Sequence, residues 1–301
     1  MKKSPFELCR IPGFGFRRVD AIVRKTDNRP RDPMRIGGAL HCTLDEAKGK
    51  QGHLFLERET LCKAAFKLLN EKIPLPEMRV RPEEVEKELD GMILNGSVVS
   101  MRDNIYHPAV FAQEDETASR IARLLAEERP PMKDISAVIE TVRTELGLRI
   151  SGKQESAVRT AFLYNLSIIT GSPGTGKTTV LKIILEVYRR LWPDNKIVLM
   201  APTGRASRRM AESTGFEGAC TLHSGLGLVS EEDEGSRNRK KDGLDADMVI
   251  VDEFSMVDMW LAGKFFPALK KGAKIILVGD PDQLPIVGAG NVFKEFIQCG
   301  L

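Results

Sequence analysis

The C-terminal half of the chain alternates between short apolar runs and longer segments with helical periodicity. Four apolar runs have the length of strands and end at glycine, proline or acidic residues, namely 166–170, 196–201, 248–251 and 274–279. Segments of helical spacing, such as 180–186, lie between them. Strands that alternate with helices are typical of a parallel sheet covered on both faces. We therefore predict a doubly wound α/β domain whose ligands bind at the carboxyl ends of its strands.

The first 150 residues show a different, mainly helical pattern. A short helix is predicted to begin at Ser4-Pro5, and a second apolar pattern continues to about Lys25. Three helix-like segments and a β-hairpin follow, an order that resembles a winged helix. Further helices are predicted on either side of Pro130-Pro131, and residues 229–245 are predicted to be a long exposed loop. The predicted elements are helices at 35–47, 59–70, 82–95, 114–128 and 134–146, and hairpin strands at 96–100 and 105–111.

A glycine-rich turn between a predicted strand and a predicted helix carries the most specific chemistry. Gly171 to Thr178 fits the pattern G-x-x-x-x-G-K-[ST], whose backbone N–H groups curl around a polyphosphate. Lys177 is predicted to reach the terminal phosphates, and the helix N-terminus adds a favourable dipole. A chance match is the alternative, and the placement between strand and helix favours nucleotide binding. The predicted nucleotide-binding residues are Gly171, Ser172, Pro173, Gly174, Thr175, Gly176, Lys177, Thr178 and Thr179.

Acidic and amide side chains follow two other predicted strands. Asp252 and Glu253 end the run 248–251, and Gln283 follows the run 274–279. Hard oxygen ligands suit Mg²⁺, so we predict that Asp252 and the Thr178 hydroxyl hold this ion. Glu253 is predicted to polarise the attacking water, and Gln283 to contact the γ-phosphate. Lys177, Asp252, Glu253 and Gln283 are therefore the predicted catalytic set, although in isolation an acidic strand end would be read as a cap.

Two segments are candidates for DNA binding. The turn Ile11-Pro12-Gly13-Phe14-Gly15-Phe16 resembles a helix-hairpin-helix element, in which backbone N–H groups meet a DNA phosphate without reading sequence. We predict contacts from Gly13, Gly15, Arg17 and Arg18, and an ordinary helical corner is the alternative. The second segment follows the strand 196–201, where a small-residue turn leads into a helix with three arginines. The predicted DNA-binding residues there are Pro202, Thr203, Arg205 and His223.

Composition narrows the class of protein. The chain has 301 residues, of which 42% are hydrophobic and 29% charged, as expected of a soluble globular protein. The net charge is only +3, but residues 1–35 hold ten Lys/Arg against four Asp/Glu, which would attract a polyanion. Five scattered cysteines are predicted to be reduced core residues, and four dispersed histidines indicate no zinc site. No signal peptide or membrane span is evident, so we predict a cytoplasmic protein.

The motifs together resemble the RecD-like family of superfamily 1 DNA helicases. The resemblance rests on GSPGTGKT, APTGRA, TLH, VDEFSMVD and GDPDQLP in this order, with the hairpin and winged-helix regions of long-form members in front. It implies a RecA-like motor that uses ATP and Mg²⁺ to move 5′→3′ on single-stranded DNA and at duplex junctions, in DNA repair or recombination. It also implies that Gln154 recognises adenine. The predicted domains are a helix-hairpin-helix element at 1–34, a winged-helix-like domain at 35–112, a helical connector at 113–150 and the RecA-like domain at 151–301.

One departure from this family bears on activity. The resemblance implies a second RecA-like domain that supplies an arginine finger, and no such sequence precedes Leu301. We therefore expect an incomplete motor that hydrolyses ATP very slowly, because such an arginine can contribute on the order of 10³–10⁵ in rate. A phosphoryl-transfer kinase is a second reading, but it does not explain residues 279–285. A DNA-binding module that holds nucleotide without turnover is the alternative to an enzyme.

Overall fold

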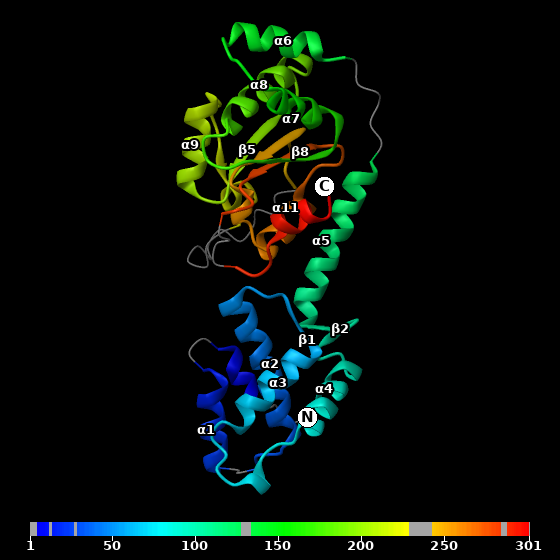
Figure 1. Cartoon of the computed structure of the whole chain (residues 1–301), viewed down its shortest axis with the longest axis vertical. Coiled ribbons are helices and arrows are strands. Elements are labelled where there is room, and N and C mark those ends of the chain that lie inside the picture. Colours follow the sequence, from blue (N-terminus) through cyan, green and yellow to red (C-terminus); the bar gives the residue numbers. More distant parts are fainter. Residues whose placement is uncertain are drawn as a thin grey trace. The chain divides into compact units, whose positions relative to one another are not determined.

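The structure is a computed structural model that describes residues 5–11, 14–26, 29–127, 134–228, 243–283 and 288–300. The chain divides into two compact units (Figure 1). The N-terminal unit comprises Met1–Glu114 with Gly288–Gly290, and the C-terminal unit comprises Asp115–Val287 with Asn291–Leu301. Gly13 and most of the predicted loop 229–245 lie outside the described residues. Each unit is considered by itself below.

The N-terminal unit contains the predicted helices and hairpin, together with a strand that the sequence pattern did not reveal. That strand, β1, pairs with the hairpin to form an antiparallel sheet of order β1–β3–β2. Its three residues are too few to show a period. The elements are η1 (Pro5–Arg10), α1 (Phe16–Thr26), α2 (Pro33–Glu46), η2 (Ala47–Gln51), β1 (Phe55–Glu57), α3 (Arg58–Asn70), η3 (Pro76–Met78), α4 (Pro82–Leu94), β2 (Val99–Met101) and β3 (Asn104–Tyr106).

The prediction for the segment after the hairpin was wrong in one respect. The strand predicted at 105–111 ends at Tyr106, and the helix α5 (Pro108–Ala126) begins at once. Proline has no N–H to lose at the first helical position and its fixed φ suits a helix start, so Pro108 begins α5 rather than continuing a strand. Ile121 and Leu124 are buried as predicted, but Leu125 is 44% exposed and does not belong to the apolar stripe.

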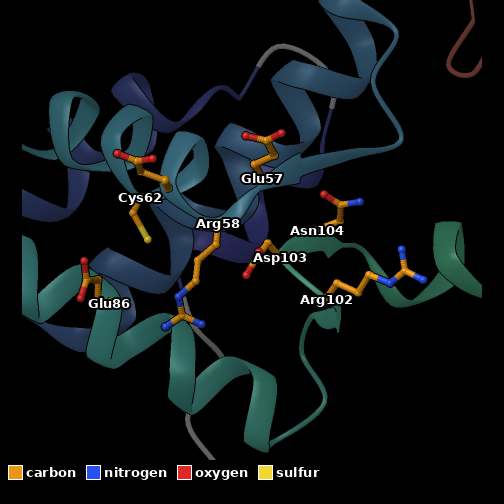
Figure 2. Close-up of a pocket in the computed structure, with 8 residues that line it drawn as sticks. Glu57, Arg58, Cys62, Glu86, Arg102, Asp103 and Asn104 are labelled. Carbon is orange, nitrogen blue, oxygen red and sulfur yellow. The ribbon is translucent and has the colours of Figure 1, made fainter.

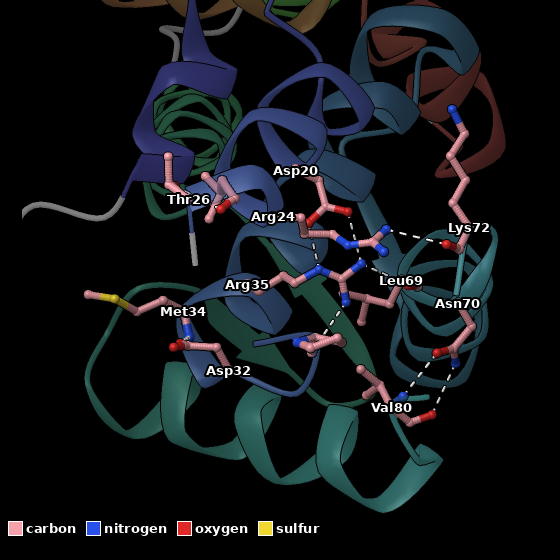
Figure 3. A network of polar contacts seen from close by, with 12 residues as sticks. Asp20, Arg24, Thr26, Asp32, Met34, Arg35, Leu69, Asn70, Lys72 and Val80 are labelled. Atoms are coloured by element: carbon pink, nitrogen blue, oxygen red, sulfur yellow. Dashed lines mark hydrogen bonds and ion pairs between the residues drawn. The ribbon is translucent and has the colours of Figure 1, made fainter. Parts of the chain in front are cut away.

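A buried ion pair joins three helices of the N-terminal unit (Figure 3). Arg35 on α2 donates two hydrogen bonds to Asp20 on α1, with Nε–Oδ1 at 2.6 Å and Nη2–Oδ2 at 2.9 Å. Its remaining donors meet the carbonyl oxygens of Pro30 and Leu69. Burying a guanidinium costs free energy unless it is fully paired, and here every interaction is charge-assisted. The predicted DNA-binding helix α1 therefore shares one core with α2 and α3.

The C-terminal unit is built on a parallel sheet of order β4–β8–β7–β5–β6. The four predicted strands are present, and the two-residue strand β6 adds a fifth. Buried clusters lie on both faces of the sheet, as expected of a doubly wound domain. The elements are α6 (Ser136–Glu145), α7 (Gly152–Leu163), β4 (Leu166–Thr170), α8 (Lys177–Leu191), β5 (Ile197–Ala201), α9 (Gly204–Thr214), β6 (Cys220–Thr221), α10 (Leu222–Gly225), β7 (Met248–Val251), η5 (Phe254–Met256), α11 (Met259–Ala268), β8 (Lys274–Gly279) and α12 (Val292–Gln298).

None of the five cysteines forms a disulfide, but the prediction that they are core residues was wrong for Cys299, which is exposed. Cys42 is buried, and burial beside Cys42 and Asp45 raises the pKa of the Cys9 thiol to about 11. Such a thiol is a poor nucleophile at neutral pH, so Cys9 is a packing residue. Among the described helices, none combines the length and apolar character needed to cross a membrane.

Candidate nucleotide site and nucleic-acid surface

The glycine-rich loop lies at the carboxyl end of β4 and leads directly into α8. Gly174 and Gly176 have φ values of 82° and 85°, a left-handed conformation that side chains with a Cβ rarely adopt. A Cβ on Gly176 would also come close to the Gln154 amide, which would have to move. The left-handed backbone conformation is what requires glycine at position 176, next to Lys177 at the first turn of α8.

The carboxyl ends of β4, β7 and β8 surround one open cavity of about 420 Å³. It brings together residues far apart in the sequence, as predicted from the way parallel strands end at one edge. The lining residues are Pro173, Gly174, Thr175, Gly176, Lys177, Thr178, Ala206, Arg209, Met210, Ser213, Asp252, Glu253, Gly279, Asp280 and Gln283. All four predicted catalytic residues line it, although their roles remain predictions.

Two side chains hold the loop from opposite sides. Lys177 Nζ donates to the carbonyl oxygen of Gly171, and also to that of Ser172 at 3.2 Å, which keeps its charge over the loop. Gln154 is the third residue of α7, where it forms a capping box with Ser151. Its Nε2 donates to the Thr175 carbonyl oxygen at 3.0 Å. The structure therefore places the predicted adenine-binding residue against the phosphate loop.

The carboxyl groups of Asp252 and Glu253 lie where the buried strand β7 ends. Burial raises the pKa of Asp252, and the positive charges of Lys177 and Arg209 partly oppose this. Burial and the neighbouring charge of Asp252 raise the pKa of Glu253 as well. Glu253 also has a φ of 53°, a left-handed conformation that is costly for a residue with a Cβ and is often found at functional sites. Placing both carboxyl groups here lowers the stability of the fold, which is expected where residues serve a ligand.

The donor set suits a magnesium ion bound together with a nucleotide. Thr178 and Asp252 both line the cavity and offer a hydroxyl and a carboxylate oxygen, the hard ligands that Mg²⁺ prefers. In the described part of the chain, no cluster of three or more His, Cys, Asp or Glu could hold a metal by itself. Mg²⁺ commonly uses one or two protein ligands plus substrate phosphates, so the residues present fit that mode.

Gln283 is positioned by a residue that the sequence analysis did not single out. Its Oε1 accepts a hydrogen bond from Ser255 Oγ at 3.2 Å, and Ser255 is buried in the turn after β7. Asp280 is 5% exposed, and its Oδ1 accepts from the Asp282 N–H at 3.0 Å. A Cβ on Gly279 would meet the Phe293 ring at 2.8 Å. The end of β8 is thus packed against α12 and against the turn after β7, and the hydrogen bond from Ser255 in that turn holds the Gln283 amide at the cavity.

Arg209 and Ser213 line the cavity although neither was predicted there. The sequence analysis placed the arginines of this helix on DNA because they follow the turn at Pro202. Residues four apart share one face of a helix, so Arg205, Arg209 and Ser213 form a single stripe on α9. Since β5 is the neighbour of β7 in the sheet, that stripe faces the Asp252–Glu253 end of β7. The strand order needed for this conclusion is not visible in the sequence.

The other residues predicted to contact DNA fall in two places. Pro202, Thr203 and Arg205 follow β5, and His223 follows β6. Ala201 pairs with Thr221, so these two strand ends are neighbours at the edge of the sheet that also holds the cavity. Thr203 and Thr221 each cap the helix that follows by accepting a backbone hydrogen bond. The structure therefore brings the segments at 202–205 and 223 together.

Gly15, Arg17 and Arg18 lie at the start of α1 in the N-terminal unit, and Gly13 lies outside the described residues. Arg17 and Arg18 are both exposed. Arg17 Nε donates to Glu71 Oε2 at 2.8 Å, an exposed pair that a phosphate could replace at small cost. The contacts predicted for this segment remain predictions.

A second cavity, of about 620 Å³, lies between β1, α3, α4 and the β2–β3 turn (Figure 2). Four carboxylates and two guanidinium groups line it, so its charge balance is acidic. Arg58 is also paired with Asp90, which leaves less positive charge for a ligand. Because phosphate binding relies on Lys and Arg, this face of the hairpin region does not favour DNA. Its lining residues are Glu57, Arg58, Glu59, Cys62, Glu86, Arg102, Asp103 and Asn104.

The C-terminal unit is thus a P-loop nucleotide-binding domain of the RecA-like class, with a parallel sheet, a phosphate loop after β4 and an acidic end on β7. Comparison with known proteins is consistent with this class. Residues 154–289 match the family described as "AAA domain", and residues 1–55 match the family described as "ATP-dependent RecD2 DNA helicase HHH domain".

Relatives of known name extend the match over nearly the whole chain. The ATP-dependent RecD2 DNA helicase of Deinococcus radiodurans is 30% identical over 96% of this chain and 40% of its own length. The RecBCD enzyme subunit RecD of Haemophilus influenzae is 40% identical over 48% of this chain and 26% of its own. Together these matches show that the chain belongs to the RecD-like helicase family. It spans about two fifths of the length of the RecD2 relative.

Among solved structures, the Pif1 helicase of Candida albicans is 29% identical to this chain. The match covers 46% of this chain and 34% of the other, with a TM-score of 0.34. It is too partial to carry an argument about the fold, which rests on the strand order and on the cavity.

Proposed function

We propose that the C-terminal unit is a motor domain of an ATP-dependent DNA helicase that moves 5′→3′ on single-stranded DNA. The helicase would act at duplex junctions in DNA repair or recombination. The observation that carries the proposal is the single cavity at which the phosphate loop, the acidic end of β7 and Gln283 meet. The direction of movement and the biological process come from the family resemblance alone.

The phosphate loop, Gln154 beside it and the acidic residues of the cavity have proposed parts in ATP binding and hydrolysis. The loop N–H groups and Lys177 would bind the phosphates, while Gln154 would contact adenine. Thr178 and Asp252 would hold Mg²⁺, which supplies charge neutralisation at the phosphates. Glu253 would orient and polarise the attacking water, because its carboxyl group lies at the same cavity as the loop.

Helix α9 offers a physical link between nucleotide and DNA. Its first turn contains Arg205, is capped by Thr203 and lies at the strand ends proposed to hold DNA. Further along the same helix, Arg209 and Ser213 line the nucleotide cavity. A rigid helix that contacts two ligands can be displaced by either of them. Gln283 is the proposed sensor on the other side of the cavity, because a γ-phosphate contact would compete with its hydrogen bond from Ser255.

The test is reciprocal coupling between the two ligands. Affinity of the 301-residue chain for a fluorescent oligo-dT strand is measured with ADP–Mg²⁺ and with a non-hydrolysable ATP analogue. We expect the two nucleotides to give affinities that differ by about fivefold or more, and DNA to change nucleotide affinity by the same factor, as linkage requires. Gln283→Ala should bind both ligands but lose the coupling. Two fully independent binding events would contradict the proposal.

Steady-state hydrolysis separates the remaining alternatives. DNA-stimulated release of phosphate, even at the slow rate expected of this chain, supports a motor, whereas coupled binding with no turnover at all supports the nucleotide-dependent DNA-binding module. A kinase would instead require an acceptor and would ignore single-stranded DNA.

A further inference from the structure

Trp260 is a large aromatic side chain left exposed at the first turn of α11. Of its surface, 47% is accessible, although tryptophan usually buries most of its ring. The ring lies beside His223, with ring centroids 6.0 Å apart and an angle of 30° between the planes. His223 is exposed as well. Two exposed aromatic rings from different elements thus lie next to each other on the surface of the C-terminal unit.

The pair is held on a rigid base. Asp258 caps α11 by accepting a hydrogen bond from the Leu261 N–H at 2.8 Å, and Leu261 and Phe265 anchor the helix in the core. His223 follows Thr221, whose side chain caps α10. Neither ring is on a free loop, so a ligand between or upon them would meet a preformed surface.

The pair also lies where the chain's proposed DNA contacts are. His223 lies in α10 directly after β6, and β6 pairs with β5, so this segment is next to the turn at Pro202–Thr203. The nucleotide cavity opens at β4, β8 and β7, so the two sites occupy successive parts of one sheet edge.

Exposed basic side chains occur on α11 itself and on α9, the helix that packs against β6. Arg205 and Arg208 are exposed on α9, and exposed Lys264 lies one helical turn beyond Trp260 on the same face of α11. Exposed aromatic rings near basic side chains are the combination by which proteins bind single-stranded nucleic acid without reading its sequence.

We propose that Trp260 and His223 form a stacking site for one base of a bound DNA single strand. The inference rests on the proposed function and adds a residue that neither the sequence motifs nor the comparisons assign. Tryptophan would supply the larger face and histidine a second one, while the neighbouring basic residues would bind the phosphates on either side. Because every base has an aromatic face, the site would tolerate any sequence.

The test measures binding of oligo-dT to the 301-residue chain by fluorescence anisotropy. Trp260→Ala should weaken binding by about fivefold to 150-fold, the range for loss of one base stack. Trp260→Phe should keep most of the affinity, because a phenyl ring still stacks. Tyr164→Ala is the matched control: Tyr164 is 59% exposed and lies two residues before β4, the strand at the opposite edge of the sheet from β6. It should bind like the wild type.

Three further readouts identify the interaction as stacking. A strand with abasic sites in place of the bases should bind wild type and Trp260→Ala equally. The slope of log K against log salt should also be unchanged in Trp260→Ala, because a neutral ring neutralises no phosphate. In a Trp192→Phe background, oligo-dT should quench the fluorescence of the remaining tryptophan.

The outcomes separate this inference from the proposed function. If wild type binds oligo-dT and Trp260→Ala binds it equally well, the stacking site is wrong and the proposed function stands. If the loss in Trp260→Ala is the same with the abasic strand, the ring acts on something other than a base, and the inference is also wrong. If wild type binds no single-stranded DNA, both fail.

Discussion

At the scale of single residues, the nucleotide site contains groups whose burial or backbone conformation is unfavourable for folding. Asp252 is largely buried at the end of β7, and Glu253 adopts a left-handed backbone conformation beside it. Gly176 has a left-handed backbone conformation that a residue with a Cβ rarely adopts. Such local costs are retained where a ligand offsets them. The sequence pattern predicted Lys177, Asp252 and Gln283, but it did not place Arg209 at the nucleotide cavity, because only the strand order reveals which cavity α9 faces.

The raised pKa of the Asp252 carboxyl group leads to a prediction about how stability depends on pH. Its pKa is raised above 3.8, so the folded protein holds the proton more tightly than the unfolded chain does. Stability therefore falls as the pH rises through the window between 3.8 and the raised value, and the loss is fully present at neutral pH. Asp252→Asn removes the ionisable group while keeping an oxygen that can accept from the Glu253 N–H.

We expect Asp252→Asn to be at least as stable as the wild type at pH 7 and to lose the gain in nucleotide affinity that Mg²⁺ provides. Urea unfolding at pH 7 and calorimetric titration of ADP with and without Mg²⁺ are the measurements. A variant less stable than the wild type at pH 7 would show that Asp252 has a structural role. A variant that keeps the full Mg²⁺ effect would show that Asp252 does not hold the ion.

At the scale of elements, apolar periodicity predicted the long helices and the four longer strands. It missed β1 and β6, with three and two residues, because runs this short show no period. It also continued a strand through Pro108, where a helix begins. These elements are stabilised by tertiary pairing and packing, which local patterns do not contain.

The strand β8 begins with a charged residue, Lys274, in a run that the sequence pattern treated as apolar. Lys274 is 2% exposed at the start of β8, and its Nζ donates to the carbonyl oxygens of Ala161, Phe162 and Tyr164 at 2.6, 3.1 and 2.9 Å. These are carbonyl groups at the C-terminus of α7, where helices leave acceptors unsatisfied and where a cation is favourable. Lys274 therefore ties α7, which carries Gln154, to β8, an interior strand of the sheet.

We expect Lys274→Met, which keeps the length of the side chain, to lower the free energy of unfolding by about 2–5 kcal/mol, because buried acceptors lose their donor. Lys264→Met on the exposed face of α11 is the matched control and should change stability by less than about 0.5 kcal/mol. Urea denaturation of both variants makes the comparison. Equal stability of Lys274→Met and wild type would mean that water replaces the ammonium group without cost.

At the scale of the whole molecule, the order of motifs along the chain predicted a helical N-terminal region followed by a P-loop domain. The relatives are consistent with that order over nearly the full length. The strand order β4–β8–β7–β5–β6 could not be predicted from residue patterns, since it depends on which crossovers pack best. That order decides which strand ends adjoin, and so it places the cavity and the aromatic pair on the same edge of the sheet.

The central claim is that the loop after β4 binds a nucleotide through Lys177, and calorimetry of ATP–Mg²⁺ binding tests it most directly. Lys177→Ala should bind at least about tenfold more weakly, because each charge-assisted hydrogen bond contributes about 1.5–3 kcal/mol. Lys182→Ala, further along α8 and outside the cavity, should bind like the wild type. Equal affinity of Lys177→Ala and wild type would contradict the assignment of the loop and the account built on it.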